Sequence, residues 1–168
     1  MKTKETKQMK NQTKTAALTR AAMTAALYVV LTLVANMLGL ANGAVQIRLS
    51  EALTVAPIFF AESIGGLTAG CLIANLITLC APLDVIFGTI ATLLGALGTR
   101  ALRKSRPLAV MCPIVSNTVI VPFVLKFAYG LGDAWWYMAF TVCIGEIISC
   151  ALIGTLVIKI FDKHKTRL

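Results

Sequence analysis

The segment AAMTAALYVVLTLVANMLGLANGAVQI, residues 21–47, contains no charged side chain. A helix needs about 20 mainly apolar residues to cross the hydrocarbon core of a bilayer, so this segment is long enough to span a membrane. A cleaved signal peptide has a shorter apolar core behind fewer polar residues, so a retained span fits better. We expect the first membrane helix to run from about Leu18 to Leu40.

The rest of the 168-residue chain has the same apolar character. Hydrophobic residues make up 58% of it, charged residues only 14%, and the mean hydropathy is +0.82. Soluble domains carry roughly a quarter charged residues, which excludes an ordinary water-soluble protein. The length accommodates at most about six spans and leaves no room for a separate catalytic or nucleotide-binding domain.

Five further apolar stretches follow the first, at residues 49–61, 63–83, 85–99, 107–125 and 135–160. The second stretch is short and begins beside Arg48 and Glu51, so it is expected to lie against other helices or a cavity. The predicted fold is an all-α integral membrane protein with six transmembrane helices. It is divided into a basic tail (1–15), a six-helix membrane domain (16–161) and a second basic tail (162–168).

The net charge of +9 is concentrated in three basic clusters. Six basic residues lie within the first 20 positions, four lie at 100–106, and four lie at 159–167. Six crossings place all three clusters on one side, which the positive-inside rule assigns to the cytoplasm together with both termini. These charges lie between the apolar stretches and do not form one basic face, which argues against a nucleic-acid partner. The basic tails can still contact anionic membrane lipid.

Six polar side chains in or near the spans are the candidate site residues: Arg48, Glu51, Asn75, Asp84, Asn117 and Glu146. A charge at the bilayer centre costs about 2.5–3.5 kcal/mol on insertion scales, so such residues are functional by default. Glu146 lies roughly 16 Å along its helix from Trp135, near the middle of the membrane. Glu51 and Asp84 lie at the outer ends of their spans, so the group can converge on a cavity open to the outside.

Each of these residues also has a purely structural interpretation. Arg48 and Glu51 are three residues apart and can form an ion pair on one helical turn. Glu146 can be held by a buried hydrogen bond, and Asn75 and Asn117 can join neighbouring helices.

Small residues recur at four-residue intervals in the first span, in the series Ala17, Ala21, Ala22, Ala25 and Ala26. This spacing lets another helix approach closely. The approaching helix can belong to the same protein or to a partner, and the position near the cytoplasmic end favours a partner.

The sequence lacks the common catalytic motifs. GxxxxGK[ST], GxSxG, HExxH and paired CxxC motifs are all missing, so no enzyme activity is predicted. Five scattered cysteines and a single histidine in the C-terminal tail predict neither a metal site nor a cofactor. Cys143 and Glu146 are three residues apart, which leaves an intramembrane enzyme as a third alternative.

The strings VQIRLSEALTVAPIFF, GGLTAGCLIANL, DVIFGTIATLLGAL and IGEIISC resemble the QueT family over nearly the whole chain. These proteins are the substrate-binding (S) components of energy-coupling factor (ECF) transporters for queuosine precursors. The resemblance implies a multi-pass protein of a prokaryotic plasma membrane. It also implies that the alanine series docks on the transmembrane coupling protein EcfT, which carries two ATPase subunits.

The implied ligand is a 7-deazaguanine, such as the 7-aminomethyl base or queuine. A carboxylate can accept the paired N–H donors of a guanine-like edge, amides suit its carbonyl and ring acceptors, and a second carboxylate suits the ammonium group. We expect Glu146 or Glu51 at the guanine edge and Asp84 at the amine. The alternatives are an S component for a flavin or pterin, and a solitary proton-coupled secondary transporter with Glu146 as the titrating group.

Overall fold

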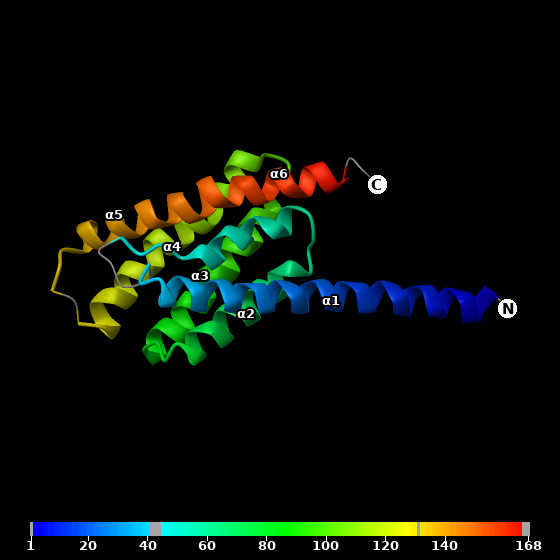
Figure 1. The fold of residues 1–168 in the computed structure, drawn as a ribbon, viewed down its shortest axis with the longest axis horizontal. Helices are drawn as coiled ribbons and strands as arrows, with labels where there is room; N and C mark the ends of the chain where they lie inside the picture. Colours follow the sequence, from blue (N-terminus) through cyan, green and yellow to red (C-terminus); the bar gives the residue numbers. More distant parts are fainter. Residues whose placement is uncertain (1, 41–44, 131, 166–168) are drawn as a thin grey trace.

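The computed structural model describes residues 2–40, 45–130 and 132–165, and this part of the chain is helical without strands (Figure 1). The elements in chain order are α1 (Lys2–Met37), the 3₁₀ helix η1 (Leu49–Ile58), α2 (Ser63–Ile77), α3 (Pro82–Ala101), α4 (Arg106–Ala128), α5 (Trp135–Glu146), the π-helical segment η2 (Ile147–Ile153) and α6 (Gly154–Lys165). Because α5, η2 and α6 follow one another without a break, they form a single long helix. The predicted all-α class is confirmed, with six helical segments in the expected order.

Four stretches of the described residues are long and apolar enough to cross a membrane: Thr13–Met37, Pro82–Ala101, Arg106–Ala128 and Trp135–Lys163. The other two segments are shorter than the predicted spans. At the rises of 3₁₀ and α-helices, η1 is roughly 20 Å long and α2 roughly 22 Å, less than the roughly 30 Å of a hydrocarbon core. These two segments therefore fall short of the full crossings expected for residues 49–61 and 63–83.

Local chemistry explains why η1 is a tight 3₁₀ helix. The Thr54 hydroxyl and the Cys150 thiol both donate to the Glu51 carbonyl oxygen, at 2.6 and 3.5 Å. Pro57, inside η1, has no backbone N–H to donate. Side-chain donors on the backbone and a missing N–H both weaken a regular α-helical ladder.

The basic segment 1–15, expected as a tail, is helical from Lys2 and continuous with the first span. Figure 1 shows this first part of α1 projecting beyond the rest of the molecule. Part of the predicted C-terminal tail is also helical, since α6 continues to Lys165; residues 166–168 lie outside the described part.

η1 is the central element of the bundle. It packs against α1, α2, α3, α4, η2 and α6, while the longer helices pack against their sequence neighbours. Seven of its ten residues are buried, among them Glu51, Thr54 and Val55. Polar residues of η1 therefore lie in the interior, surrounded by helices on all sides.

The three basic regions meet at one end of the molecule. Arg20 of α1 pairs with Glu62 and lies over the Phe60 ring, while Arg100 of α3 donates to the Pro57 carbonyl at 3.0 Å. Arg106 at the start of α4 donates to Asp162 of α6 through both terminal nitrogens. Figure 1 places the start of α1 and the end of α6 at this same end.

The contact between α1 and α2 depends on two glycines. A Cβ atom at Gly66 would lie 2.4 Å from the carbonyl oxygen of Ala21, and one at Gly70 would lie 3.0 Å from that of Ala25. Because these carbonyls belong to helix backbone, they cannot move aside cheaply. Ala21 and Ala25 thus pack against this protein's own α2.

We predict that Gly66→Ala destabilises the protein by about 1–3 kcal/mol, the usual cost of overpacking a close contact. Thermal unfolding in detergent measures the change. Gly65→Ala is the matched control, since nothing lies within 4 Å of its Cβ position. Because alanine is the better helix former, the control should be neutral or slightly stabilising. Equal unfolding temperatures for the two variants would contradict the close α1–α2 contact.

Candidate functional site

The structure gathers all six predicted polar residues around η1. Arg48 and Glu51 come from the start of η1, Asn75 from α2, Asp84 from α3, Asn117 from α4 and Glu146 from α5. The exposed fraction is 0% for Glu51, 1% for Asn117 and 4% for Glu146. Five different elements thus contribute polar side chains to one buried region.

An inner group forms where η1, α4 and the α5–η2 junction meet. Ligand atoms of Glu51, Glu146 and Cys150 all lie within 4.8 Å of one another, and the Cys150 thiol donates to Glu146 Oε2 at 3.3 Å. Asn117 lies beside both carboxyl groups. Cys150 reaches this position from the π-helical segment, a kind of helix defect that often occurs at functional sites.

Tyr28 of α1 and Thr92 of α3 complete the inner group. The Tyr28 hydroxyl donates to Glu51 Oε1 at 2.5 Å, and the Thr92 hydroxyl donates to the same oxygen at 3.4 Å. Both residues lie within apolar spans, where an isolated hydroxyl gives no distinctive sequence signal. Only the folded arrangement shows that they hold the Glu51 carboxyl group.

An outer group surrounds Asp84 at the start of α3. Its Oδ2 accepts a hydrogen bond from the Tyr129 hydroxyl at 2.9 Å, and its Oδ1 lies 4.0 Å from Arg48 Nη2. The Asn75 amide donates to the Asp84 backbone carbonyl at 3.4 Å. Arg48 therefore forms its ion pair with Asp84, and not with Glu51 as the spacing along one turn allowed.

Tyr129 follows α4 and lies outside its membrane-spanning stretch. Burial and the neighbouring Asp84 carboxylate raise the pKa of its hydroxyl above the ordinary value. The hydroxyl therefore remains protonated and continues to donate to Asp84 at physiological pH.

The position of Arg48 depends on a close backbone contact. A Cβ atom at Gly145 of α5 would lie 2.1 Å from the carbonyl oxygen of Gln46, two residues before Arg48. Only glycine allows this carbonyl to lie against α5. The contact holds the chain entering η1 across the helix that carries Glu146.

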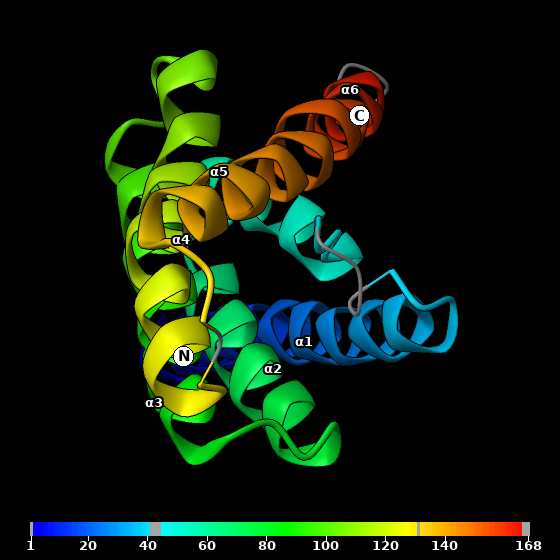
Figure 2. The same cartoon turned by 90° about the vertical axis from the view of Figure 1, so that its left-hand side faces the viewer.

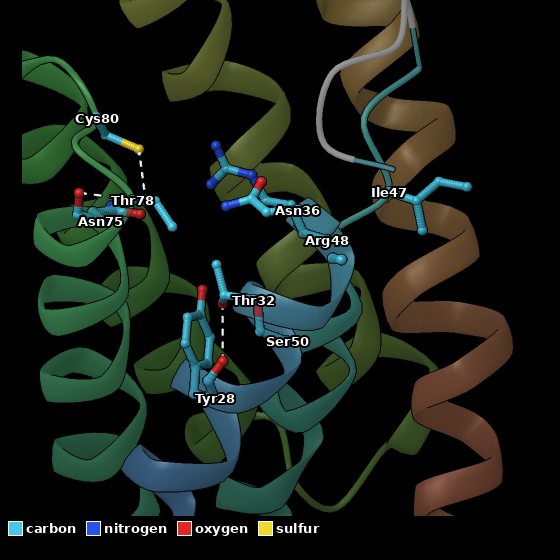
Figure 3. A pocket seen from close by; sticks show the side chains of 10 residues that line it. Tyr28, Thr32, Asn36, Ile47, Arg48, Ser50, Asn75, Thr78 and Cys80 are labelled. Carbon is cyan, nitrogen blue, oxygen red and sulfur yellow. Dashed lines mark hydrogen bonds between the residues drawn. The ribbon is translucent and has the colours of Figure 1, made fainter. Parts of the chain in front are cut away.

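A cavity of about 60 Å³ lies between the outer half of α1, the start of η1 and the end of α2. Figure 3 shows the Tyr28 hydroxyl, the Arg48 guanidinium and the Asn75 amide around it, with Ile47 pointing away. The cavity can hold water molecules, each of which needs about 10–15 Å³ of such volume. It connects the surroundings of the inner and outer groups, because Tyr28 contacts Glu51 and Arg48 contacts Asp84.

Several buried polar atoms of the site lack a partner at ordinary hydrogen-bonding distance among the described residues. They are Glu51 Oε2, Asp84 Oδ1 and both side-chain atoms of Asn117. A buried polar group without a partner costs about 1–3 kcal/mol, so folded proteins rarely retain one without a use. Acceptors and an amide in this arrangement can bind a small molecule that offers several N–H donors and a carbonyl.

Metal and catalytic roles are less well supported by the same atoms. Glu51, Glu146 and Cys150 could together offer three ligands to a cation, but the positive charge of Arg48 lies nearby and opposes binding of a cation.

Cys143, the thiol that sequence spacing placed near Glu146, instead packs among apolar side chains that include Val110 and Ile114. The thiol that contacts Glu146 is Cys150.

The alanine series divides between two surroundings. Ala17, Ala21 and Ala25 are half-buried, and the last two lie against α2. Ala22 and Ala26 are exposed on the other side of α1. These two are the members of the series that remain accessible to another protein.

Membrane-length helices around buried polar side chains, as in the described part of this chain, are typical of membrane proteins that bind small molecules. The particular family follows from comparison of the sequence. Residues 18–163 match the QueT transporter family, and the chain belongs to this family.

One similar protein is the queuosine precursor transporter QueT of Lactococcus lactis subsp. cremoris (strain MG1363). It is 38% identical over 72 residues, which is 43% of this chain and 42% of that protein. The matched part therefore spans about two fifths of the relative. No solved structure matches the chain.

We predict that Asn117→Leu raises the unfolding temperature of the ligand-free protein, because it removes an unpaired buried amide that costs about 1–3 kcal/mol. Asn75→Leu is the matched control. The Asn75 amide donates to Asp84, so its loss should lower the unfolding temperature. A lower unfolding temperature for both variants would show that Asn117 has a stabilising partner.

Proposed function

We propose that this protein is the substrate-binding component of an ECF-type importer, and that it captures a queuosine precursor of the 7-deazaguanine class. The observation that carries the proposal is the set of unpaired polar atoms on Glu51, Asp84 and Asn117. Membership of the QueT family and the name of the Lactococcus relative support the substrate class.

The inner group suits the guanine-like part of the ligand. A carboxylate of Glu146 or Glu51 accepts the two adjacent N–H donors, an arrangement that resembles a bidentate guanidinium contact. The Asn117 amide, beside both carboxyl groups, donates to a carbonyl or ring acceptor. The bound ligand would thereby supply hydrogen-bond partners to the buried polar atoms that have none without it.

The outer group suits the substituent at position 7. Asp84 Oδ1 has no hydrogen bond and lies 4.0 Å from Arg48, so an ammonium group can replace this long ion pair. The cavity of about 60 Å³ is smaller than ordinary ligand sites of about 300–1,000 Å³. Binding therefore includes displacement of Arg48 from Asp84 to enlarge the cavity.

ATP-driven transport would require partner subunits, because the chain has no phosphate-binding loop of its own. In this proposal Ala22 and Ala26 dock on EcfT, and two ATPases drive reorientation and release. The end that carries Arg20, Arg100, Arg106 and both termini faces the cytoplasm of a prokaryotic cell, as the positive-inside rule requires. The helical bundle from residue 16 to 161 performs binding, and the basic ends flank it.

A second candidate is a solitary proton-coupled transporter. The close approach of the Glu51 and Glu146 carboxyl groups favours it, because two carboxylates within 4.8 Å repel each other and one of them can take up a proton instead. This alternative predicts uptake into vesicles that contain the chain alone and a proton gradient. The ECF proposal predicts uptake only with EcfT, the ATPases and ATP.

The direct test is calorimetric binding to the purified chain without partners. The panel contains the aminomethyl-deazaguanine base, queuine, guanine, riboflavin and folate. Selective binding of a deazaguanine is expected. Binding of riboflavin or folate alone would reassign the ligand to the flavin or pterin class, and binding of none would withdraw the substrate proposal.

In the same measurement, Glu146→Gln should weaken deazaguanine binding by at least about 30-fold, since losing one partner of a buried charged contact costs about 2 kcal/mol or more. Glu62→Gln removes a carboxylate that pairs with Arg20 outside the site and should leave the affinity unchanged. Equal affinity of Glu146→Gln and the unaltered chain would remove Glu146 from the site.

Docking is tested separately with Ala22→Leu and Ala26→Leu. Each should abolish co-purification with EcfT while leaving ligand affinity unchanged, because a larger side chain separates closely packed helices. Ala16→Leu is the control, since Ala16 is exposed on another face of α1. Normal co-purification of a chain that carries both substitutions would show that EcfT binds elsewhere.

A further inference from the structure

A second feature, lined by residues other than those of the polar site, is an apolar groove between α4 and α6. Its volume is about 440 Å³, and its walls include Val110, Met111 and Ile114 of α4 opposite Ala151 and Ile158. Val110, Ile114 and Ile158 also belong to a buried apolar cluster that includes Val55 of η1.

The groove exists because α4 and α6 diverge. α6 packs against η1 and η2, and Figure 2 shows the red end of α6 set apart from the start of α4. At this end the ion pair between Arg106 and Asp162 bridges the two helices. The groove therefore runs from this bridge toward the middle of the membrane.

The polar groups of the groove lie at its basic end. Arg106 and Lys159 line it, and Lys163 lies one turn beyond Lys159 on α6. Arg106 uses two of its five N–H donors on the Asp162 carboxylate, so donors remain for a second acceptor. Along the walls, the Thr155 hydroxyl donates to the Ala151 carbonyl, which leaves a largely apolar surface.

The dimensions restrict what can occupy this space. Its volume of about 440 Å³ lies in the range of about 300–1,000 Å³ that small-molecule sites occupy. An extended alkyl chain is thin and needs no hydrogen bond from the walls. Apolar walls with cations at one end therefore fit a long-chain amphiphile with an anionic headgroup.

We propose that the α4–α6 groove binds one anionic phospholipid from the leaflet at the basic end of the molecule. One acyl chain lies between Met111 and Ala151, and the phosphate accepts hydrogen bonds from Arg106 and Lys159. The lipid connects two helices that otherwise diverge. This site shares no residue with the polar site, so the proposal does not depend on the identity of the transported ligand.

Native mass spectrometry of the full chain tests the proposal, with phosphatidylglycerol and phosphatidylcholine of identical acyl chains as probes. One phosphatidylglycerol should be retained about fivefold more strongly than phosphatidylcholine, as expected for one basic side chain at an anionic headgroup. Lys159→Gln should abolish most of this preference. Lys104→Gln removes the same charge from the adjacent basic loop, outside the groove, and should preserve the preference.

Two further measurements test the apolar part. Ala151→Phe should lower the retention of both lipids, because it fills the groove without changing charge; elution as an unaltered folded species is its control. A photoreactive residue at position 111 should form lipid adducts in membranes. Equal retention of the two lipids, an equal effect of Lys104→Gln and Lys159→Gln, or protein adducts from position 111 would each overturn the proposal.

Discussion

The structure depends on the burial of Glu51 at the centre of a helical bundle. Its side chain is inaccessible, one carboxylate oxygen accepts from Tyr28 and Thr92, and the other has no hydrogen bond. Placing a carboxyl group in such surroundings is costly unless partners surround it. The helices around η1 supply those partners, and α5 adds a second carboxyl group within 4.8 Å. The unpaired atoms that remain are those to which we assign the ligand in the proposed function.

Close backbone contacts make this arrangement possible. η1 is too short to cross a membrane alone, so its polar residues can lie inside only if the surrounding helices approach one another. Gly66 and Gly70 bring α2 against α1, and Gly145 brings the Gln46 carbonyl against α5. In a membrane, where apolar side chains gain little from leaving lipid, such small-residue contacts are a main source of helix association.

The outer surface of the bundle contrasts with this interior. Large apolar side chains such as Leu27, Val30 and Phe123 are about half exposed, as expected for surfaces that contact lipid. Within that surface, the exposed pair Ala22 and Ala26 permits close approach of a helix, whereas the α4–α6 groove has apolar walls and basic side chains at one end. The protein contact and the lipid contact that we propose therefore lie on different faces of the molecule.

By itself, the sequence determined the membrane class, the order of the helical segments and the identity of the polar residues, because hydropathy and charge are local properties of the chain. It did not show that Arg48 pairs with Asp84, that Cys150 and not Cys143 meets Glu146, or that Ala21 and Ala25 face α2. Nor did it show that Tyr28 donates a hydrogen bond to Glu51 or that Tyr129 donates one to Asp84. Those facts depend on the 3₁₀ and π geometry of η1 and η2 and on contacts between distant segments, and only the tertiary structure decides them.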